Sequence, residues 1–218
     1  MQKLLAKLIA TVGLTLAALC GGGCQIIGAM AGSYEATGSH EVKTLYDGLD
    51  QKKFAVVVRA GQMIQADYPE VVVKLTVDIS ERLQQNVNAS GYVPGVRVID
   101  YLYNHPRWIA TPYEDIARNL GVERLIYVEL TEYRLQDPGN AYLWQGVSGA
   151  TVGVIEADGS APEEFAFRKA IRVEFPDKAG YTANDMTRAV VNTELVRRTV
   201  DRVSWLFYDH EEMNRSDY

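Results

Sequence analysis

Residues 116–129 read IARNLGVERLIYVE, and the change of pattern within this stretch decides the fold. Apolar residues recur at helical spacing as far as Leu120, and Gly121 is the residue type that most often ends a helix. The apolar run from Leu125 to Leu130 follows at once and has the composition of a strand. A helix that leads directly into a strand indicates a domain in which helices pack against a sheet.

The segment before this stretch predicts two further strands and a long helix. Phe54–Val58 is a continuous apolar run, which is typical of a strand buried on both faces. Pro69 opens a helix whose apolar residues recur at threes and fours as far as Val87. Val93 and Val96–Asp100 predict the second strand.

The helix of the opening stretch is expected to begin at Pro112. Thr111 is its candidate N-cap, and Glu114, three residues later, completes the pattern of a capping box. Residues 101–108, just upstream, predict a short helical turn that breaks ahead of Pro106.

The later half predicts three long strands and a final helix. The strand segments are 124–135, 143–156 and 164–175, and Asp158-Gly159 is a hairpin turn between the last two. Apolar residues are expected to share one face of the last strand and one face of the helix over 184–209. These residues are Phe165, Phe167, Ile171, Val173 and Phe175 in the strand, and Met186, Val190, Thr193, Val196, Val200, Val203 and Phe207 in the helix.

Three glycines, Gly146, Gly149 and Gly153, fall within one strand segment. They do not form a phosphate-binding loop, because no helix follows them and no Lys-Ser/Thr pair is present. They predict a bulge or a close approach of another part of the chain.

The predicted order is β-α-β-α-β-β-β-α, a single α+β domain with a mixed sheet whose antiparallel meander is covered by helices. This order resembles the N-terminal domain of TolB and the related periplasmic core of the CsgG-like curli-secretion lipoproteins. Phe54–Val58 and the opening stretch carry the resemblance, which extends from Lys53 to Tyr208. It implies a periplasmic module that binds protein partners and a family in which rings form. No pair of alternating strands is left for the membrane-spanning hairpins of the curli channel.

The N-terminus resembles a bacterial lipoprotein signal peptide. Lys3 and Lys7 precede an apolar run, Leu8–Leu19, that is shorter than the roughly 20 residues needed to span a bilayer. Cys24 follows three glycines and is the expected lipidation site. The resulting division is a signal peptide over 1–23, a lipidated Cys and flexible linker over 24–48, the TolB-like or CsgG-like domain over 49–210 and a polar tail over 211–218.

Other readings of the N-terminus remain open. Cys20 is the alternative lipidation site, a Cys20–Cys24 disulfide would close only a short loop, and an uncleaved anchor could extend through the glycines to Met30. The lipoprotein and uncleaved-anchor readings both place the protein at the periplasmic side of the cell envelope. Gln25 after Cys24 favours the outer membrane over the inner membrane.

Composition narrows the function classes. The 218-residue chain has a formal net charge of -6, so it lacks the basic character of a nucleic-acid-binding protein. Its three histidines, at positions 40, 105 and 210, are far apart and have no carboxylate at ligand spacing, so we expect no metal and no cofactor. No set of residues has catalytic spacing, which favours a non-enzymatic protein.

Aromatic residues within 92–113 are expected to form either a core or rim cluster where the second strand meets the second helix, or a docking surface for an envelope protein. Such side chains bury much area and still satisfy a polar tip. They are Tyr92, Tyr101, Tyr103, Trp108 and Tyr113. The favoured function is therefore a membrane-anchored protein-interaction module in an envelope transport or assembly complex, and self-association stays open. The alternative is a lipid-anchored hydrolase or small-ligand-binding protein whose cleft is lined by Glu129, Thr131 and Tyr133 on one strand face.

Overall fold

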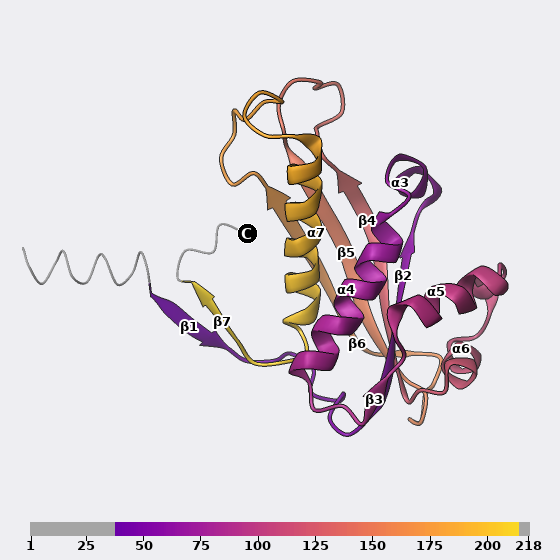
Figure 1. The fold of residues 1–218 in the computed structure, drawn as a ribbon. Coiled ribbons are helices and arrows are strands. Elements are labelled where there is room, and N and C mark those ends of the chain that lie inside the picture. The colour runs from indigo at the N-terminus through magenta and orange to yellow at the C-terminus, as the bar shows by residue number, and fades with distance from the viewer. Residues whose placement is uncertain (1–37, 214–218) are drawn as a thin grey trace, which may run out of the picture. The chain divides into compact units, whose positions relative to one another are not determined.

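The computed structural model describes residues 38–213, which divide into two compact units. The larger unit, Lys43–His210, is an α+β domain built on a five-stranded sheet (Figure 1). Residues outside it contribute strand β1, Ser39–Val42, and most of strand β7, His210–Met213, and these two strands pair with each other. The sequence predicted neither strand, since β1 falls in the expected linker and β7 largely in the expected tail. None of the helices in the described range is long and apolar enough to cross a membrane.

The α+β class and the mixed sheet with an antiparallel meander are confirmed. The strand order is β3-β2-β4-β5-β6, with β2 parallel to β3 and β4, and with β4, β5 and β6 antiparallel. The strands of this sheet are β2 (Lys53–Ala60), β3 (Gly91–Tyr92), β4 (Arg124–Arg134), β5 (Gly146–Glu156) and β6 (Phe165–Phe175). The helices are α3 (Gln62–Asp67), α4 (Val71–Asn86), α5 (Gly95–Asn104), the short 3-10 helix η1 (Trp108–Ala110), α6 (Tyr113–Leu120) and α7 (Arg188–Ser204).

Helices cover the two faces of the sheet unequally. Helices α4 and α7 lie side by side across one face and form the larger core with it, while α5 and α6 cover part of the other face (Figure 1). Strand β2 is buried on both faces, as its continuous apolar run predicts: Val56 joins the larger core and Val57 the smaller one. The part of the second face that α5 and α6 leave uncovered carries charged side chains of β4 and β6.

The segment Val96–Asp100 is helical, so the predicted strand at this position is wrong. Pro94 is the N-cap of α5, and Val98 and Leu102, four residues apart, are buried on its inner side. Helix α5 begins close against α4, because a Cβ added to Gly95 would lie 2.6 Å from Cα of Val77. Val96 and Val98 have the alternate spacing of a strand, and the helical spacing becomes visible only when Leu102 is included.

The start of α6 also differs from the prediction. Pro112 is the N-cap, and the capping contacts come from Glu163, whose carboxylate accepts the N–H groups of Tyr113 and Glu114 at 3.0 and 2.8 Å. The Thr111 hydroxyl instead donates to the carbonyl of Arg107 at 3.4 Å. The predicted capping box is therefore wrong, because a carboxylate distant in sequence takes its place.

The final helix is shorter than predicted, and near its start a different side of the helix is buried from the one predicted. It begins after Thr187, whose side-chain oxygen accepts the N–H of Val190 at 3.3 Å. Val191 and Leu195 are fully buried near its start, whereas Val190 is 51% exposed and Thr193 is exposed too. The predicted stripe is wrong at Val190 and Thr193 and correct for Val196, Val200, Val203 and Phe207, although Phe207 lies beyond the helix.

A bulge corrects the predicted face of β6. The register of β5 and β6 shifts between Val154 and Ile155, which pair with Phe167 and Phe165. Phe165 therefore packs in the smaller core, while Phe167 packs against the larger one. The remaining predicted residues of this face, Ile171, Val173 and Phe175, also lie on the side of the larger core.

Candidate functional site

A cavity of about 480 Å³ lies between α5, the end of α6 and the first residues of β2 and β3. Its lining combines basic, aromatic and amide side chains with one carboxylate, and comes from segments that the sheet brings together. The principal residues are Lys53, Tyr92, Arg97, Asp100, Tyr101, His105 and Asn119.

The two strongest bases of this cavity have no acidic partner. Within residues 38–213, the side chains of Lys53 and Arg97 form no hydrogen bond or ion pair. The Tyr101 hydroxyl accepts a hydrogen bond from the amide of Asn119 at 3.1 Å. The ring of His105 stacks on Tyr101, and its Nδ1 lies 2.8 Å from the Tyr101 carbonyl oxygen, an arrangement in which Nδ1 donates. The aromatic groups are thus held in place while the cations remain available.

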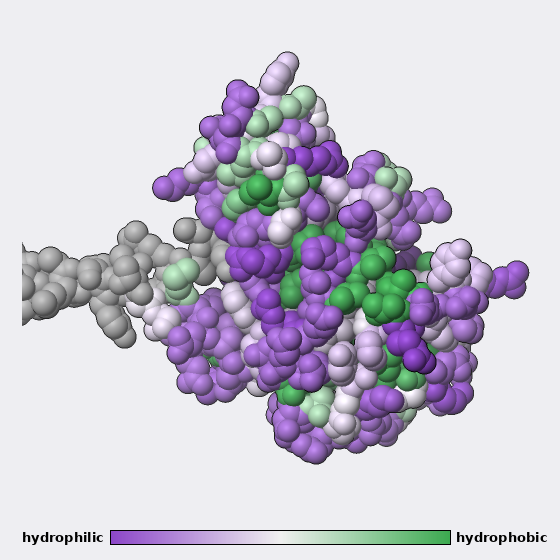
Figure 2. Space-filling view, in the orientation of Figure 1, coloured by the Kyte–Doolittle hydropathy of each residue, from purple (hydrophilic) through white to green (hydrophobic). Residues whose placement is uncertain are grey.

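Exposed apolar residues lie beside this cavity on the outer side of α5. Val96 is 60% exposed and Tyr103 is 86% exposed, and the spacing of seven residues places them on the same side of the helix. Figure 2 shows hydrophobic side chains gathered over α4 and the beginning of α5. Exposed apolar surface rimmed by polar groups is typical of a protein interaction site.

The five aromatic residues of the predicted docking surface do not form one surface. Tyr92 and Tyr101 line the cavity, and Tyr103 is exposed beside it. Trp108 and Tyr113 instead pack against the ring of Tyr127 in the smaller core, at centroid distances of 6.4 and 5.4 Å. These residues come from four elements, β3, α5, η1 and α6, and so they do not share one surface.

Sequence reasoning missed the basic residues of the cavity. Lys53 begins β2, Arg97 lies in α5 and Asn119 in α6, so no short motif contains them. Arg97 could be assigned to the cavity from sequence only if Val96–Asp100 were recognised as helical. Arg97, Tyr101 and Asn104 would then lie on the same side of the helix.

A second polar feature occupies the uncovered part of the sheet. Glu132 of β4 accepts hydrogen bonds from Arg134 at 2.9 Å and from Arg172 of β6, and Arg172 also contacts Glu174 at 3.1 Å. Burial alone would raise the pKa of Glu132, but the hydrogen bonds from Arg134 and Arg172 outweigh it and lower that pKa. Glu132 therefore stays ionised and joins two strands that are not neighbours.

The glycines of β5 lie close to other segments of the chain. A Cβ on Gly149 would lie 3.4 Å from Cβ of Glu132, which is close to ordinary van der Waals contact. A Cβ on Gly153 would lie 2.4 Å from the ring of Phe165, and one on Gly146 would lie 2.8 Å from the carbonyl oxygen of Phe175. The predicted close approach of other chain segments is confirmed.

The alternative cleft along Glu129, Thr131 and Tyr133 does not form. The register of β4 and β5 shifts between Leu130 and Glu132, so these residues do not share a face. Glu129 pairs with Arg59 at 3.5 Å, the Thr131 hydroxyl donates to the carbonyl of Gly149 at 3.1 Å, and Tyr133 is buried in the larger core. Across residues 38–213, no group of three or more His, Cys, Asp or Glu residues is placed to hold a metal ion.

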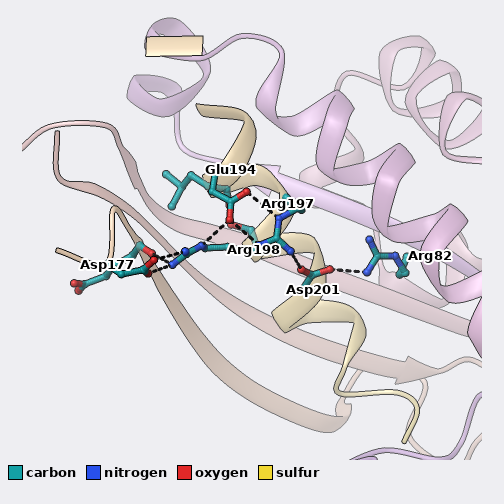
Figure 3. A network of polar contacts seen from close by, with 9 residues as sticks. Arg82, Asp177, Glu194, Arg197, Arg198 and Asp201 are labelled. Carbon is teal, nitrogen blue, oxygen red and sulfur yellow. Dashed lines mark hydrogen bonds and ion pairs between the residues drawn. The ribbon is translucent and has the colours of Figure 1, made fainter. Parts of the chain in front are cut away.

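A third polar cluster joins α4 and α7 (Figure 3). Asp201 accepts hydrogen bonds from Arg82 at 2.5 Å and from Arg197 at 2.6 Å, and only 5% of its side chain is exposed. Nearer the start of α7, Arg198 contacts Glu194 and also Asp177 from the segment after β6. Asp201 and Arg198 are buried and paired with more exposed charges of neighbouring elements, which indicates a role in stability.

The two cysteines, Cys20 and Cys24, lie outside the described residues, so their roles stay predictions.

Comparison with known proteins adds solved structures at low sequence identity. No protein-family model matches the sequence, and no curated protein matches it. A PelC dodecamer from Paraburkholderia phytofirmans aligns over 78% of this chain and 96% of its own, with 10% identity and a TM-score of 0.45. Lipoprotein GNA1162 from Neisseria meningitidis aligns over 70% and 97%, with 11% identity and a TM-score of 0.44. The hypothetical protein CT253 from Chlamydia trachomatis aligns over 72% and 98%, with 13% identity and a TM-score of 0.39. Likenesses at this level assign no function.

Proposed function

We propose that this protein is an exported lipoprotein that binds protein partners of the cell envelope through the cavity beside α5. The observation that carries the proposal is the pair of uncompensated cations, Lys53 and Arg97, next to the exposed Tyr103. The domain acts by binding, not by catalysis.

The chemistry of the cavity favours a partner segment that carries carboxylates. The chain has a formal net charge of -6, so a cavity with two bases and one acid, Asp100, is a local exception to its overall charge. Complementary charges speed association and select partners, while buried aromatic residues supply much of the affinity. A partner carboxylate at Lys53 and Arg97, with an apolar side chain against Tyr103, would use both features.

The anchor is part of the same proposal. A lipid-bearing Cys24 would hold the domain at a membrane surface, because several acyl chains on one residue give stable anchoring where a single chain does not. Gln25 favours the outer membrane, and the resemblance of the element order to the TolB and CsgG-like domains fits a role in an envelope transport or assembly complex.

The anchor is tested by labelling cells with radioactive palmitate and replacing each cysteine in turn. Labelling is expected to persist in Cys20→Ala and to disappear in Cys24→Ala. The reverse result would place the lipid on Cys20, and label in neither parent nor variants would contradict the lipoprotein assignment.

Partner binding is tested by chemical cross-linking in membranes followed by co-purification. The double variant Arg97→Glu/Tyr103→Ala changes two exposed side chains and should lose the partners that the parent chain retains. Lys178→Glu is the matched control, because Lys178 is exposed and lies in the segment after β6, at the opposite edge of the sheet. Equal partner yields from parent, double variant and control would contradict the proposal.

A further inference from the structure

Strand β6 forms one edge of the five-stranded sheet, and its outer backbone groups have no strand beside them within the described chain. In an antiparallel sheet the N–H and C=O of one residue point to the same side, and the side alternates along the strand. The N–H of Ala157 donates to the carbonyl of Glu123 on the β4 side at 2.9 Å. The backbone N–H and C=O groups of odd-numbered residues of β5 therefore point toward β4, and those of even-numbered residues point toward β6. Since Ala150 pairs with Ile171, Ile171 faces inward and the even-numbered residues of β6 face outward.

The outward groups belong to Arg168, Ala170, Arg172 and Glu174. The position of Glu174 agrees with this assignment, because its carbonyl oxygen accepts a hydrogen bond from Arg198 at 2.8 Å. Ala170 and Arg172 are exposed and leave the middle of the edge open. An open edge of this length is a template for pairing with another strand.

We propose that β6 pairs antiparallel with β6 of a second copy of this chain, with Ile171 on the two-fold axis. Only registers that pair outward residues with outward residues are allowed, because a shift by one residue would bring the wrong backbone groups together. Charge then selects among the allowed registers. With Ile171 at the axis, Arg168 lies opposite Glu174 of the second copy, and Ala170 lies opposite Arg172.

The neighbouring registers are unfavourable. Shifting the axis to Ala170 would place Arg168 opposite Arg172, and shifting it to Arg172 would place two copies of that arginine together. Like charges directly opposite each other destabilise a strand pair. An axis at Lys169 would place two lysines together in the same way.

The chosen register also suits the uncharged contacts. Within residues 38–213 the side chain of Arg168 forms no hydrogen bond or ion pair, and its guanidinium lies 5.7 Å from the centre of the Phe165 ring, so it can meet a carboxylate. On the face of the larger core, Phe167 would lie opposite Phe175 of the second copy, and the two copies of Ile171 would lie opposite each other. All three are only partly buried in the single chain, and pairing would cover them. Lys169 lies on this face and would be opposite Val173. A lysine on an edge strand hinders pairing with other strands.

Disulfide formation tests the register directly in the full chain in membranes. Residues opposite each other in a non-hydrogen-bonded pair have Cα atoms about 4.5 Å apart, which lies within the range of a disulfide. Ile171→Cys should therefore give a disulfide-linked dimer that a reductant converts to monomer. Lys169→Cys is the matched control, because the two copies of residue 169 would lie four residues apart along the strands, or about 14 Å. The parent chain sets the baseline for the native cysteines.

Charge exchange gives a second measurement in the same Ile171→Cys background. Arg168→Glu should reduce the oxidised dimer several-fold, and adding Glu174→Arg should restore it. No dimer in Ile171→Cys, an equal yield in Lys169→Cys, or no restoration by the charge exchange would each overturn the proposal. The α5 cavity lies at the other edge of the sheet, so partner loss in Arg97→Glu/Tyr103→Ala remains a separate result.

Discussion

Arg198 shows at the scale of one residue how this domain holds a charge in its interior. Its side chain is 5% exposed and lies against the ring of Phe175, with its Nη2 2.8 Å from Asp177 and its Nε 3.0 Å from Glu194. Burial lowers the pKa of Arg198, but the hydrogen bonds that its guanidinium donates to Asp177 and Glu194 outweigh it, and the net effect raises that pKa. The guanidinium stays charged and ties the segment after β6 to α7.

Replacing this arginine should weaken the whole domain. Removing one member of a buried ion pair costs about 3–5 kcal/mol, and we expect Arg198→Ala near the lower end because Asp177 and Glu194 are partly exposed. The free energy of unfolding, measured by urea denaturation, checks this. Arg97→Ala removes an exposed arginine and should change stability by no more than about 0.5 kcal/mol. Equal effects of the two substitutions would contradict the prediction.

A glycine gives a second prediction at this scale. A Cβ at Gly95 would lie 2.6 Å from Cα of Val77 and 2.9 Å from the carbonyl oxygen of Thr76, and backbone atoms cannot move aside cheaply. Gly95→Ala should therefore destabilise the protein by about 1–3 kcal/mol, as overpacking does. Gly61→Ala is the control, because nothing lies within 4 Å of its added Cβ. Thermal unfolding of both variants checks the difference.

At the scale of elements, α6 depends on a carboxylate from the loop between β5 and β6. Glu163→Ala removes the acceptor for two N–H groups at the start of the helix and should cost about 1 kcal/mol. Glu164→Ala removes the neighbouring carboxylate, which makes no such contact, and should have little effect. Thr111→Ala should likewise be close to neutral, since its hydroxyl contacts only Arg107. If urea denaturation showed a larger loss of unfolding free energy in Thr111→Ala than in Glu163→Ala, the capping box would be the correct description.

The bulges show a further property of elements. The shift beside Thr131 in β4 separates Glu129 from Tyr133, and the shift beside Ile155 turns Phe165 away from Phe167. Each bulge adds one residue to one strand and so reverses the side-chain alternation beyond it. A strand pattern read from sequence assumes unbroken alternation, which explains both wrong face assignments.

For the whole molecule, ion pairs within α7 and between distant segments predict how stability depends on pH. The pKa of Glu194 is lowered chiefly by the hydrogen bond from Arg197, and that of Asp158 chiefly by the hydrogen bond from Lys52. A carboxylate whose pKa is lowered in the folded state stabilises that state above its unfolded pKa, and the stabilisation is lost as pH falls through the folded pKa. Stability should therefore be nearly constant above about pH 5 and should fall below about pH 4.

The same pH series checks the cause of the acid loss. Glu194→Gln/Asp158→Asn should be less stable than the parent at pH 7 and should lose less stability between neutral and acid pH. Urea denaturation at each pH gives both quantities. If the double variant kept the parent's acid slope, other carboxylates would have to account for it.

The sequence by itself determines the class of fold, the strand buried on both faces, the meander and the close approaches of the β5 glycines. Each of these depends on side-chain spacing within about a dozen residues, which the local pattern contains. The lipoprotein signature is equally local, and its lipidation site stays a prediction.

Only the tertiary structure decides which distant groups meet. Arg82 and Asp201 are 119 positions apart, and Glu163 caps a helix that begins 50 positions earlier. The cavity beside α5 requires Lys53, Arg97 and Asn119 to converge from three elements. Even the helical state of Val96–Asp100 depends on the packing of Gly95 against α4, because a short valine-rich segment fits either conformation until a neighbouring element selects one.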